Sequence, residues 1–283
     1  MYRRTFIVTI FVLYLSGGVR AGSKDVVERT IEADGADEIS LSMEFSAGEL
    51  NITPKSMTSV AEIELRYDPS RVDYEIDYDT RGDIGMLTIE SSPRRKRSMD
   101  TEDNIWQICL SQEYPMSLDF EIGASEADLE LGGLRITELT MDIGAAEGEL
   151  RFSEPNPIRM ETFDIDAGAA SLDGVQLGNA NFDECNFSGG AGSFNLDFRG
   201  EYHGESSISI NIGLGSADII LPEDIPVRVV TDSDGWFSSI DFHQDHLDEV
   251  DDGEWETDDF ENARTRIVLE VDVGLGSVDI YFK

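Results

Sequence analysis

Histidines are the first residues in this chain whose type and spacing could support chemistry. There are three, His203, His243 and His246, and the last two stand in the acidic run His243-Gln244-Asp245-His246-Leu247-Asp248. A His-x-x-His pair beside carboxylates can hold a transition metal when a helix brings both rings to one face. The acidic composition favours a solvated loop instead. We therefore predict no metal site and keep only four weak candidate ligands: His243, Asp245, His246 and Asp248.

Two further patterns carry weaker signals. Asp232-Ser233-Asp234-Gly235 begins like a calcium-binding loop, but the third oxygen ligand and the distant glutamate of such a loop are missing. Cys109 and Cys185 can form a disulfide only if their Cα atoms lie within about 7 Å of each other. Buried free thiols are the alternative, and the sequence leaves both open.

Catalytic groups cannot be singled out by type and spacing. Acid–base catalysis needs paired carboxyl groups in a cleft, and among 59 acidic residues chance pairs are everywhere. A nucleophile motif of the Gly-x-Ser-x-Gly type is absent from the sequence, and the glycine-rich segments lack the helix and lysine of a phosphate-binding loop. We predict no enzyme and no cofactor. The alternative is a polysaccharide-acting enzyme with a carboxylate-lined groove and Trp236 or Trp255 as a sugar platform.

Charge narrows the range of partners. The formal net charge is −38, which argues against nucleic acid and anionic lipid as ligands. Such a surface can reflect a saline habitat, divalent-cation binding or a solvated extracellular face. The one basic run, Pro93-Arg94-Arg95-Lys96-Arg97-Ser98, is interpreted as an exposed loop; a protease site or a contact for an anionic polymer is the alternative.

The N-terminus predicts export. Arg3 and Arg4 precede an apolar run from Phe6 to Leu15, and Val19-Arg20-Ala21 is typical of a cleavage site. The run is about half the length needed to span a bilayer. Residues 1–21 are therefore predicted to be a signal peptide, and the mature chain, which has no further span, to be periplasmic or extracellular.

Most of the chain must be built from strands that turn at small residues. Leu118, Phe120 and Ile122 alternate with acidic residues, as in a half-buried strand. Apolar residues change from even to odd positions near Thr137-Glu138, which predicts a bulge there. From Gly123 to Gly213, glycine corners recur every 21 to 24 residues, a period typical of a solenoid. The corner glycines are Gly48, Gly123, Gly144, Gly168, Gly190, Gly213, Gly215, Gly274 and Gly276.

These observations predict an all-β protein, with a single stack of strand rungs and an N-terminal β cap. The segment Gly213–Ile219 is repeated almost letter for letter by Gly274–Ile280, which indicates equivalent rungs. We expect the cap at residues 22–115 and the repeat β-solenoid at residues 116–283, with an acidic insertion at about 231–263. An atypical terminal unit is what a repeat array needs to cover its open end.

Several motifs resemble, in their order along the chain, the toast-rack family and the LiaF-like proteins of the cell envelope. The resemblance covers nearly all of residues 30–283 and rests on Phe45–Ile52, Tyr114–Leu118, Leu139–Ala145 and Ile212–Pro222. It implies a cell-envelope β-solenoid without known catalysis, related to adhesin-like proteins of similar rung structure. Many relatives carry membrane helices, whereas this chain has none after its N-terminal run.

The functional prediction is a non-catalytic binding or scaffold protein of the cell envelope, linked to envelope stress by the resemblance. A surface adhesin is the alternative from another class. The partner is predicted to be an envelope protein or polymer, which the sequence does not identify, and the oligomeric state stays open.

Overall fold

The fold is all-β, as predicted. The computed structural model describes residues 24–94, 104–231, 238–243 and 247–283. Helical structure in these residues is confined to two short 3-10 turns, η2 (Leu177–Ala180) and η3 (Phe260–Asn262), and none of it is long and apolar enough to cross a membrane. Several predictions lie outside the described residues: the signal peptide, the basic residues after Arg94, Asp232–Gly235, Trp236, Asp245 and His246.

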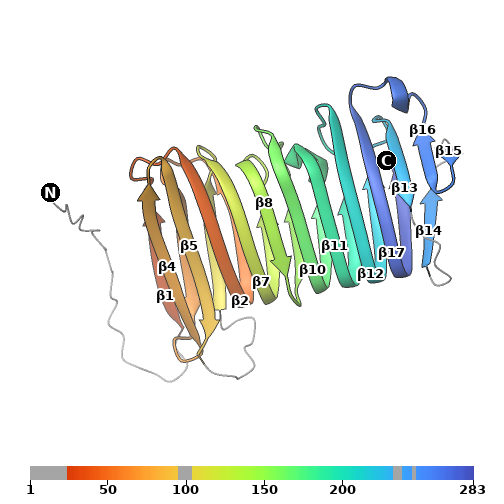
Figure 1. The fold of residues 1–283 in the computed structure, drawn as a ribbon. Coiled ribbons are helices and arrows are strands. Elements are labelled where there is room, and N and C mark those ends of the chain that lie inside the picture. The colour runs from red at the N-terminus through yellow and green to blue at the C-terminus, as the bar shows by residue number, and fades with distance from the viewer. Residues whose placement is uncertain (1–23, 95–103, 232–237, 244–246) are drawn as a thin grey trace.

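Six long strands form the middle of the molecule and lie side by side in one stack (Figure 1). Each strand bends at its glycine-rich corner, which divides it into a first arm and a second arm, and we call this bent unit a rung. One further rung is interrupted at Gly144-Ala145-Ala146 and consists of β8 (Arg135–Ile143) and β9 (Glu147–Arg151). The continuous rungs are β2 (Glu38–Lys55), β7 (Pro115–Glu130), β10 (Met160–Val175), β11 (Phe182–Asp197), β12 (Glu205–Leu221) and β17 (Arg266–Phe282).

Neighbouring rungs pair in parallel and in register through both arms. The order is β2, β7, β8 with β9, β10, β11, β12 and β17. Corner residues therefore face equivalent corner residues: Ala191 pairs with Leu214, and Leu214 with Leu275. This register places chemically equivalent positions of successive rungs in straight rows across the stack.

At the N-terminal end, two strands pair in parallel with β2, and the strands beyond them pair antiparallel. The first arm of β2 pairs with β5 (Ile84–Pro93), which pairs with β4 (Val72–Arg81). The second arm pairs with β6 (Asn104–Ser111), followed outward by β3 (Ala61–Tyr67) and β1 (Asp25–Ile31). Pairing is thus continuous across residue 115, and the boundary between cap and solenoid stays a prediction.

The C-terminal end corrects one expectation. The acidic stretch was expected to be a solvated loop, but its described part forms strands beyond β17. β13 (Val227–Thr231) and β14 (Ser238–His243) pair in parallel with the two arms of β17, and β16 (Glu254–Thr257) and β15 (Leu247–Asp251) extend the first-arm side. Ile240 and Phe242 pack against the core while Ser239 and Asp241 face solvent, an alternation that the many acidic residues around it concealed.

The core lies between the two arms and is formed by alternate residues. In β2, Ile39, Leu41, Met43 and Phe45 are buried, whereas the intervening side chains are exposed or half-buried. An aromatic column continues from rung to rung, with ring centroids 5.9 Å apart for Phe152–Phe163, 5.8 Å for Phe163–Phe182 and 6.4 Å for Phe182–Phe198. Such edge-on pairs add about 0.5–1.5 kcal/mol each to simple burial.

The predicted change of face near Thr137 is confirmed. Met116 pairs with Ile136 and Ser117 with Glu138, so Thr137 is the extra residue of a β-bulge. Its hydroxyl donates to the carbonyl oxygen of Met116 at 3.1 Å, which supports the irregular backbone.

Buried asparagines join the rungs at the turns opposite the corners. Asn156 donates through Nδ2 to the carbonyl oxygens of Ile136 (2.8 Å) and Ala180 (3.1 Å), and its Oδ1 accepts from the backbone N–H of Ile136 and Ile158. Asn179 donates in the same way to the carbonyl oxygen of Phe152 at 2.9 Å. These amides satisfy backbone groups that would otherwise be buried without partners.

Candidate functional site: an acidic row beside the glycine corners

Glycine is required at two of the corners, those of β12 and β17, because the backbones of successive rungs nearly touch there. A Cβ atom at Gly215 would overlap the carbonyl oxygen of Gly192, and one at Gly276 would overlap that of Gly215. Both residues also have positive φ angles, +138° and +143°, which L side chains rarely adopt. The other glycines of the sequence analysis lie in the same corner positions, where Gly123, Gly144 and Gly168 stack on each other's carbonyl groups.

A row of carboxylates runs across the first arms, two residues before the corner position occupied by Gly123. Glu44 pairs in register with Glu121, Glu121 with Asp142, and Asp142 with Asp166. The row continues toward the N-terminal end through Glu90 and Glu75. Paired strands lie about 4.8 Å apart, so six exposed carboxylates follow one another at close spacing. We call these six residues the acidic row.

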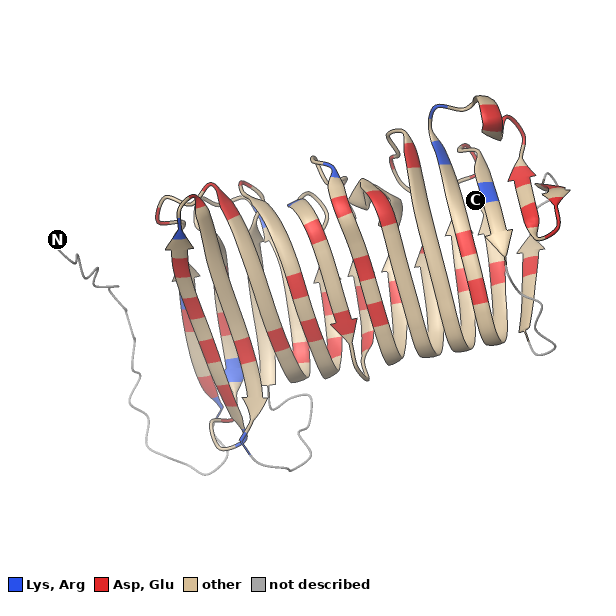
Figure 2. Ribbon diagram, in the orientation of Figure 1, with Lys and Arg blue, Asp and Glu red and all other residues tan. Residues whose placement is uncertain are grey.

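This row has no counter-charge within the described part of the chain. No ion pair or hydrogen bond joins any of the six carboxylates to a cationic side chain there. Several arginines elsewhere are paired, as Arg159 is with Asp183 and Arg266 with Glu205. Figure 2 shows acidic bands recurring on successive rungs, with few basic positions between them. Like charges directly opposite each other destabilise a sheet, so the row is maintained at a cost in stability.

A groove of about 700 Å³ lies along the acidic row. It is lined by four members of the row and by the corner backbones of five rungs, including Ser46, Gly123, Gly144, Gly168 and Gly190. Because the glycines have no side chains, a ligand in this groove can approach backbone carbonyl groups as well as carboxylates. The groove can therefore attract and hold a positively charged group.

The chemistry of the corner changes toward the C-terminal end. The positions that continue the row are Ser188, Asn211 and Asp272, so charge becomes sparse. At the tip of the same corners, Leu214 and Leu275 are 53% and 46% exposed and lie opposite each other. The corner edge is thus acidic over β2 to β10 and carries an exposed apolar pair over β12 and β17.

A second polar row crosses the second arms, but it is partly neutralised. It consists of Asn51, Asp128, Glu149, Asp173, Asn195, Asp218, Asp279 and Asp241. Glu149 forms an ion pair with Arg151, and Asp279 interacts with His243. Amides and ion pairs interrupt the charge, which distinguishes this row from the one along the groove.

Of the four candidate metal ligands, only His243 and Asp248 lie within the described residues, and they stand on different strands. His243 lies on β14, where its Nε2 is 2.7 Å from Asp279 Oδ1 and its ring stacks on Tyr281 with centroids 4.4 Å apart. Burial, and then the charges of Asp279 and Asp218, raise the pKa of Tyr281. Asp248 is exposed on β15, and its register partner in the neighbouring strand β16 is Glu256. The described residues contain no group of three or more His, Cys, Asp or Glu side chains suited to a metal ion.

Both cysteines are free thiols. Cys109 is half-buried on β6, on the second-arm side, whereas Cys185 is buried in the first arm of β11. Several rungs separate them, so they do not pair. Burial, and then the charges of Asp164 and Glu184, raise the pKa of the Cys185 thiol, which keeps it protonated and unreactive.

Of the two tryptophans proposed as sugar platforms, only Trp255 lies within the described residues. Trp255 is half-buried on β16, where its ring packs on Phe242 with centroids 4.9 Å apart, and it does not line the groove. The carboxylates of the groove stand in one row, whereas a glycosidase places its two carboxyl groups on either side of the scissile bond. This arrangement does not match that chemistry.

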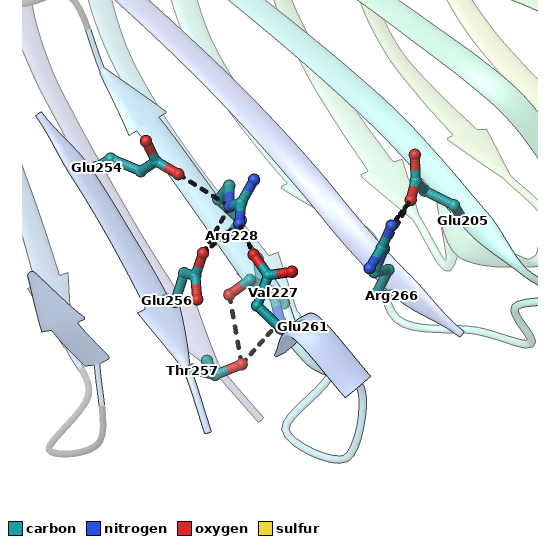
Figure 3. Close-up of polar contacts among 8 residues, drawn as sticks. All are labelled: Glu205, Val227, Arg228, Glu254, Glu256, Thr257, Glu261 and Arg266. Carbon is teal, nitrogen blue, oxygen red and sulfur yellow. Dashed lines mark hydrogen bonds and ion pairs between the residues drawn. The ribbon is translucent and has the colours of Figure 1, made fainter. Parts of the chain in front are cut away.

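Sequence reasoning missed a cluster at the C-terminal end, whose ion pairs are drawn in Figure 3. Arg228 on β13 pairs with Glu254 (2.9 Å), Glu256 and Glu261, and its guanidinium stacks on Phe260 at 4.4 Å. Arg266, which pairs with Glu205, approaches the same ring at 5.1 Å. Burial opposes the charge of Arg228, but its carboxylate partners outweigh that effect and raise its pKa. The cluster joins β13, β16 and η3 and has the character of a structural clamp.

Comparison with known protein families identifies the family of this chain. Residues 20–173 match the N-terminal domain of toast_rack, and residues 175–280 match the C-terminal region of LiaF, described as cell wall-active antibiotics response. The first match alone covers more than half of the chain. The chain therefore belongs to the toast-rack family, as its motifs predicted.

Comparisons with individual proteins are less informative. No curated protein matches the chain. Among solved structures, a candidate cell-adhesion protein from Clostridium sporogenes is 15% identical with a TM-score of 0.47, covering 92% of this chain and 100% of that one. A candidate adhesin from Bacteroides fragilis is 10% identical with a TM-score of 0.37, covering 91% and 98%.

Proposed function

We propose that this protein is a non-catalytic β-solenoid of the cell envelope that binds a positively charged envelope component along the acidic row. The single observation that carries the proposal is the groove beside Glu44, Glu121, Asp142 and Asp166. A row of uncompensated carboxylates lowers stability and supplies a strong local field, which is useful when a cationic partner neutralises it.

An extracytoplasmic location fits this role. The N-terminal residues have the order of a secretory signal, with Arg3 and Arg4, an apolar run and a small-residue cleavage site at Ala21. A net charge of −38 suits a partner of opposite charge and disfavours anionic lipid. Export thus brings the acidic row to the compartment in which an envelope partner would be met.

A connection with envelope stress is supported by family membership. The C-terminal half matches a family described as responding to cell wall-active antibiotics. Binding of a cationic component at the groove would give such a response a direct physical input. A scaffold role is compatible with the same geometry, because the rungs form one continuous stack (Figure 1).

The test is retention of envelope material by the immobilised chain from Gly22 onward. Bound proteins are identified by mass spectrometry and bound polymers by sugar and amino-acid analysis. We expect retention at low ionic strength and elution as salt is raised, because screening weakens exposed charge interactions.

A matched pair of variants assigns the surface. The groove variant carries Glu121→Gln, Asp142→Asn and Asp166→Asn; its control carries Asp128→Asn, Asp173→Asn and Asp218→Asn on the second arms. Both lose the same charge from exposed positions. Loss of retention in the groove variant alone supports the proposal. Equal loss in both variants would show that retention depends on net charge alone, and this would overturn the proposal.

A further inference from the structure

The outermost strand on the first-arm side at the N-terminal end, β4, has one open edge. Within the described residues it pairs with β5 alone, over Val72–Arg81. The N–H of Arg94 donates to the carbonyl oxygen of Arg71 at 2.7 Å, which sets the phase of the antiparallel pairing. Because alternate residues use their backbone groups toward the same neighbour, those of Tyr74, Ile76 and Tyr78 point away from β5.

The core is incompletely covered at this edge. Tyr74, Ile76 and Tyr78 are only half-buried, although they pack against the core. Their register partners one strand further in, Ile89 and Leu87, are 0% and 1% exposed. The side chains of β4 are therefore placed where one more strand would complete their burial.

Aromatic contacts hold this edge in an extended and ordered conformation. Tyr74 packs edge-on against Tyr67 of β3, with ring centroids 5.0 Å apart. The hydroxyl of Tyr78 donates to the carbonyl oxygen of Ala33 at 2.8 Å. An incoming strand would meet a preformed edge, so little ordering of β4 would oppose its addition.

The charges on the solvent-exposed face of β4 determine which charge is favoured on an incoming strand. Its exposed residues are Asp73, Glu75, Asp77, Asp79 and, at its end, Arg81. Asp73 pairs with Arg94 and Asp79 with Arg81, whereas Glu75 and Asp77 have no cationic partner among the described residues. A strand added beside β4 would place its own outward side chains next to these carboxylates.

Charge also disfavours a second copy of this chain as the occupant. Two β4 edges brought together would oppose their carboxylates. The outermost strand at the other end, β15, has the sequence Leu-Asp-Glu-Val-Asp and is acidic as well. Like charges directly opposite each other are destabilising, so end-to-end stacking of identical chains is disfavoured in both arrangements.

We propose that the β4 edge binds one extended polypeptide strand in which basic and apolar residues alternate. The backbone of the incoming strand would bond to Tyr74, Ile76 and Tyr78, its apolar side chains would cover the half-exposed end of the core, and its basic side chains would face Glu75 and Asp77. This is β-strand addition. This surface shares Glu75 with the acidic row, but it lies at the end of the stack, beyond the residues that line the groove, and it does not rest on the function proposed for the groove.

Synthetic peptides test the mode of binding. A fluorescein-labelled peptide of four Lys-Val repeats is titrated with the chain from Gly22 onward, and fluorescence anisotropy reports binding. We expect saturable binding, none by the matching Glu-Val peptide, and at least roughly tenfold weaker binding when alternate residues of the Lys-Val peptide are N-methylated, because methylation removes ladder hydrogen bonds. Equal affinity of the methylated peptide would overturn strand addition and leave charge attraction only.

Variants of the chain locate the site. Glu75→Lys with Asp77→Lys should weaken binding at least roughly tenfold, whereas Asp128→Lys with Asp173→Lys, the same charge change at exposed positions of the second arms, should leave it within about twofold. Equal weakening by both pairs would overturn the assignment. Because the peptide modification leaves the protein unaltered, the proposal stays testable if a variant misfolds. Hydrogen exchange provides a direct readout: bound peptide should protect the amides of Tyr74, Ile76 and Tyr78.

Discussion

Glu121 and Asp142 occupy directly paired positions on adjacent parallel strands, and neither has a cationic partner in the described residues. Parallel pairing in register brings each residue of one rung beside its equivalent in the next. An acidic residue at one position of the repeat therefore becomes a row of like charges, with about 4.8 Å between strands. In other rows, oppositely charged side chains reduce the repulsion between neighbouring carboxylates. In this row the repulsion persists, because the described residues supply no cationic partner.

Neutralising the pair should stabilise the protein. For Glu121→Gln with Asp142→Asn we expect the free energy of unfolding to rise by about 0.5–1 kcal/mol at low salt, because cross-strand repulsion is removed. The gain should shrink as ionic strength increases, since salt screens exposed charges. Urea unfolding at two salt concentrations measures both effects.

A matched substitution serves as the control for this prediction. Asp183→Asn removes a carboxylate that pairs with Arg159 across neighbouring rungs, so it should leave stability unchanged or lower it slightly. If the neutralised row were less stable than the original chain, the carboxylates would have a favourable role that repulsion does not describe.

Gly215 should be far less replaceable than Gly144, although both are corner glycines. At Gly215 a methyl group would overlap the Gly192 carbonyl oxygen and the φ angle is +138°. At Gly144 the φ angle is not in the positive range, and an added methyl carbon would lie 3.5 Å from its nearest neighbours, an ordinary contact distance. Gly215→Ala should cost about 3 kcal/mol or more, and Gly144→Ala less than about 1 kcal/mol.

Chemical denaturation of the two alanine variants measures this difference. Comparable stability of both would mean that the corners at β11 and β12 can move apart without cost. A soluble Gly215→Ala chain with a much lower midpoint would instead support close backbone approach as the reason for the glycine.

The repeat explains which parts of the structure could be predicted from the sequence. The recurring glycines mark the corners, several of which must admit the backbone of the next rung, and the change of parity at Thr137 marks a bulge because alternation has no other way to change face. These signals are local or strictly periodic. Family motifs are made of the same corner residues, so they were recognisable as well.

Features that depend on pairing between distant segments were not predictable. Glu44 and Glu121 are neighbours only because β3 to β6 form the N-terminal end on one side of β2, after which β7 returns to pair with β2 on its other side. Arg228 meets Glu256 because β16 folds back on β13. Strand β14 was missed because its alternating Ile240 and Phe242 stand within an acidic stretch, where composition outweighed the short pattern.

Arg228 should contribute to stability through the C-terminal end of the stack. Its guanidinium is shared by three carboxylates and stacks on Phe260. Arg228→Gln would leave Glu254, Glu256 and Glu261 facing one another without a counter-charge, so we expect a loss of about 1–3 kcal/mol. Hydrogen exchange should accelerate in β13 and β16 before it does in the central rungs.

An exposed arginine provides the comparison for this loss. Arg66 pairs with Glu64 at 2.8 Å, but its side chain is 54% exposed, and Arg66→Gln should change stability by no more than about 0.5 kcal/mol. Similar effects of the two substitutions would show that Arg228 acts as an ordinary surface pair and that the clamp contributes nothing further.

Tyr67 should make the N-terminal end sensitive to alkaline pH. Burial, together with the neighbouring Tyr74 and Asp25, raises the pKa of Tyr67 to about 12, above the usual value of about 10 for an unfolded tyrosine. A raised pKa in the folded state means that the neutral phenol is favoured there. Its contribution to stability is complete below about pH 10 and is lost as the pH rises from about 10 toward 12.

Tyr67→Phe should therefore remove part of this alkaline loss while leaving the packing against Tyr74 largely in place. The free energy of unfolding of the variant should fall less steeply above about pH 10 than that of the original chain, and ultraviolet titration should lack the tyrosinate that forms near pH 12. Tyr114→Phe is a suitable comparison, because the Tyr114 hydroxyl is exposed and donates to the carbonyl oxygen of Thr58. The original slope in the Tyr67 variant would assign the alkaline loss to other groups, since Phe cannot ionise.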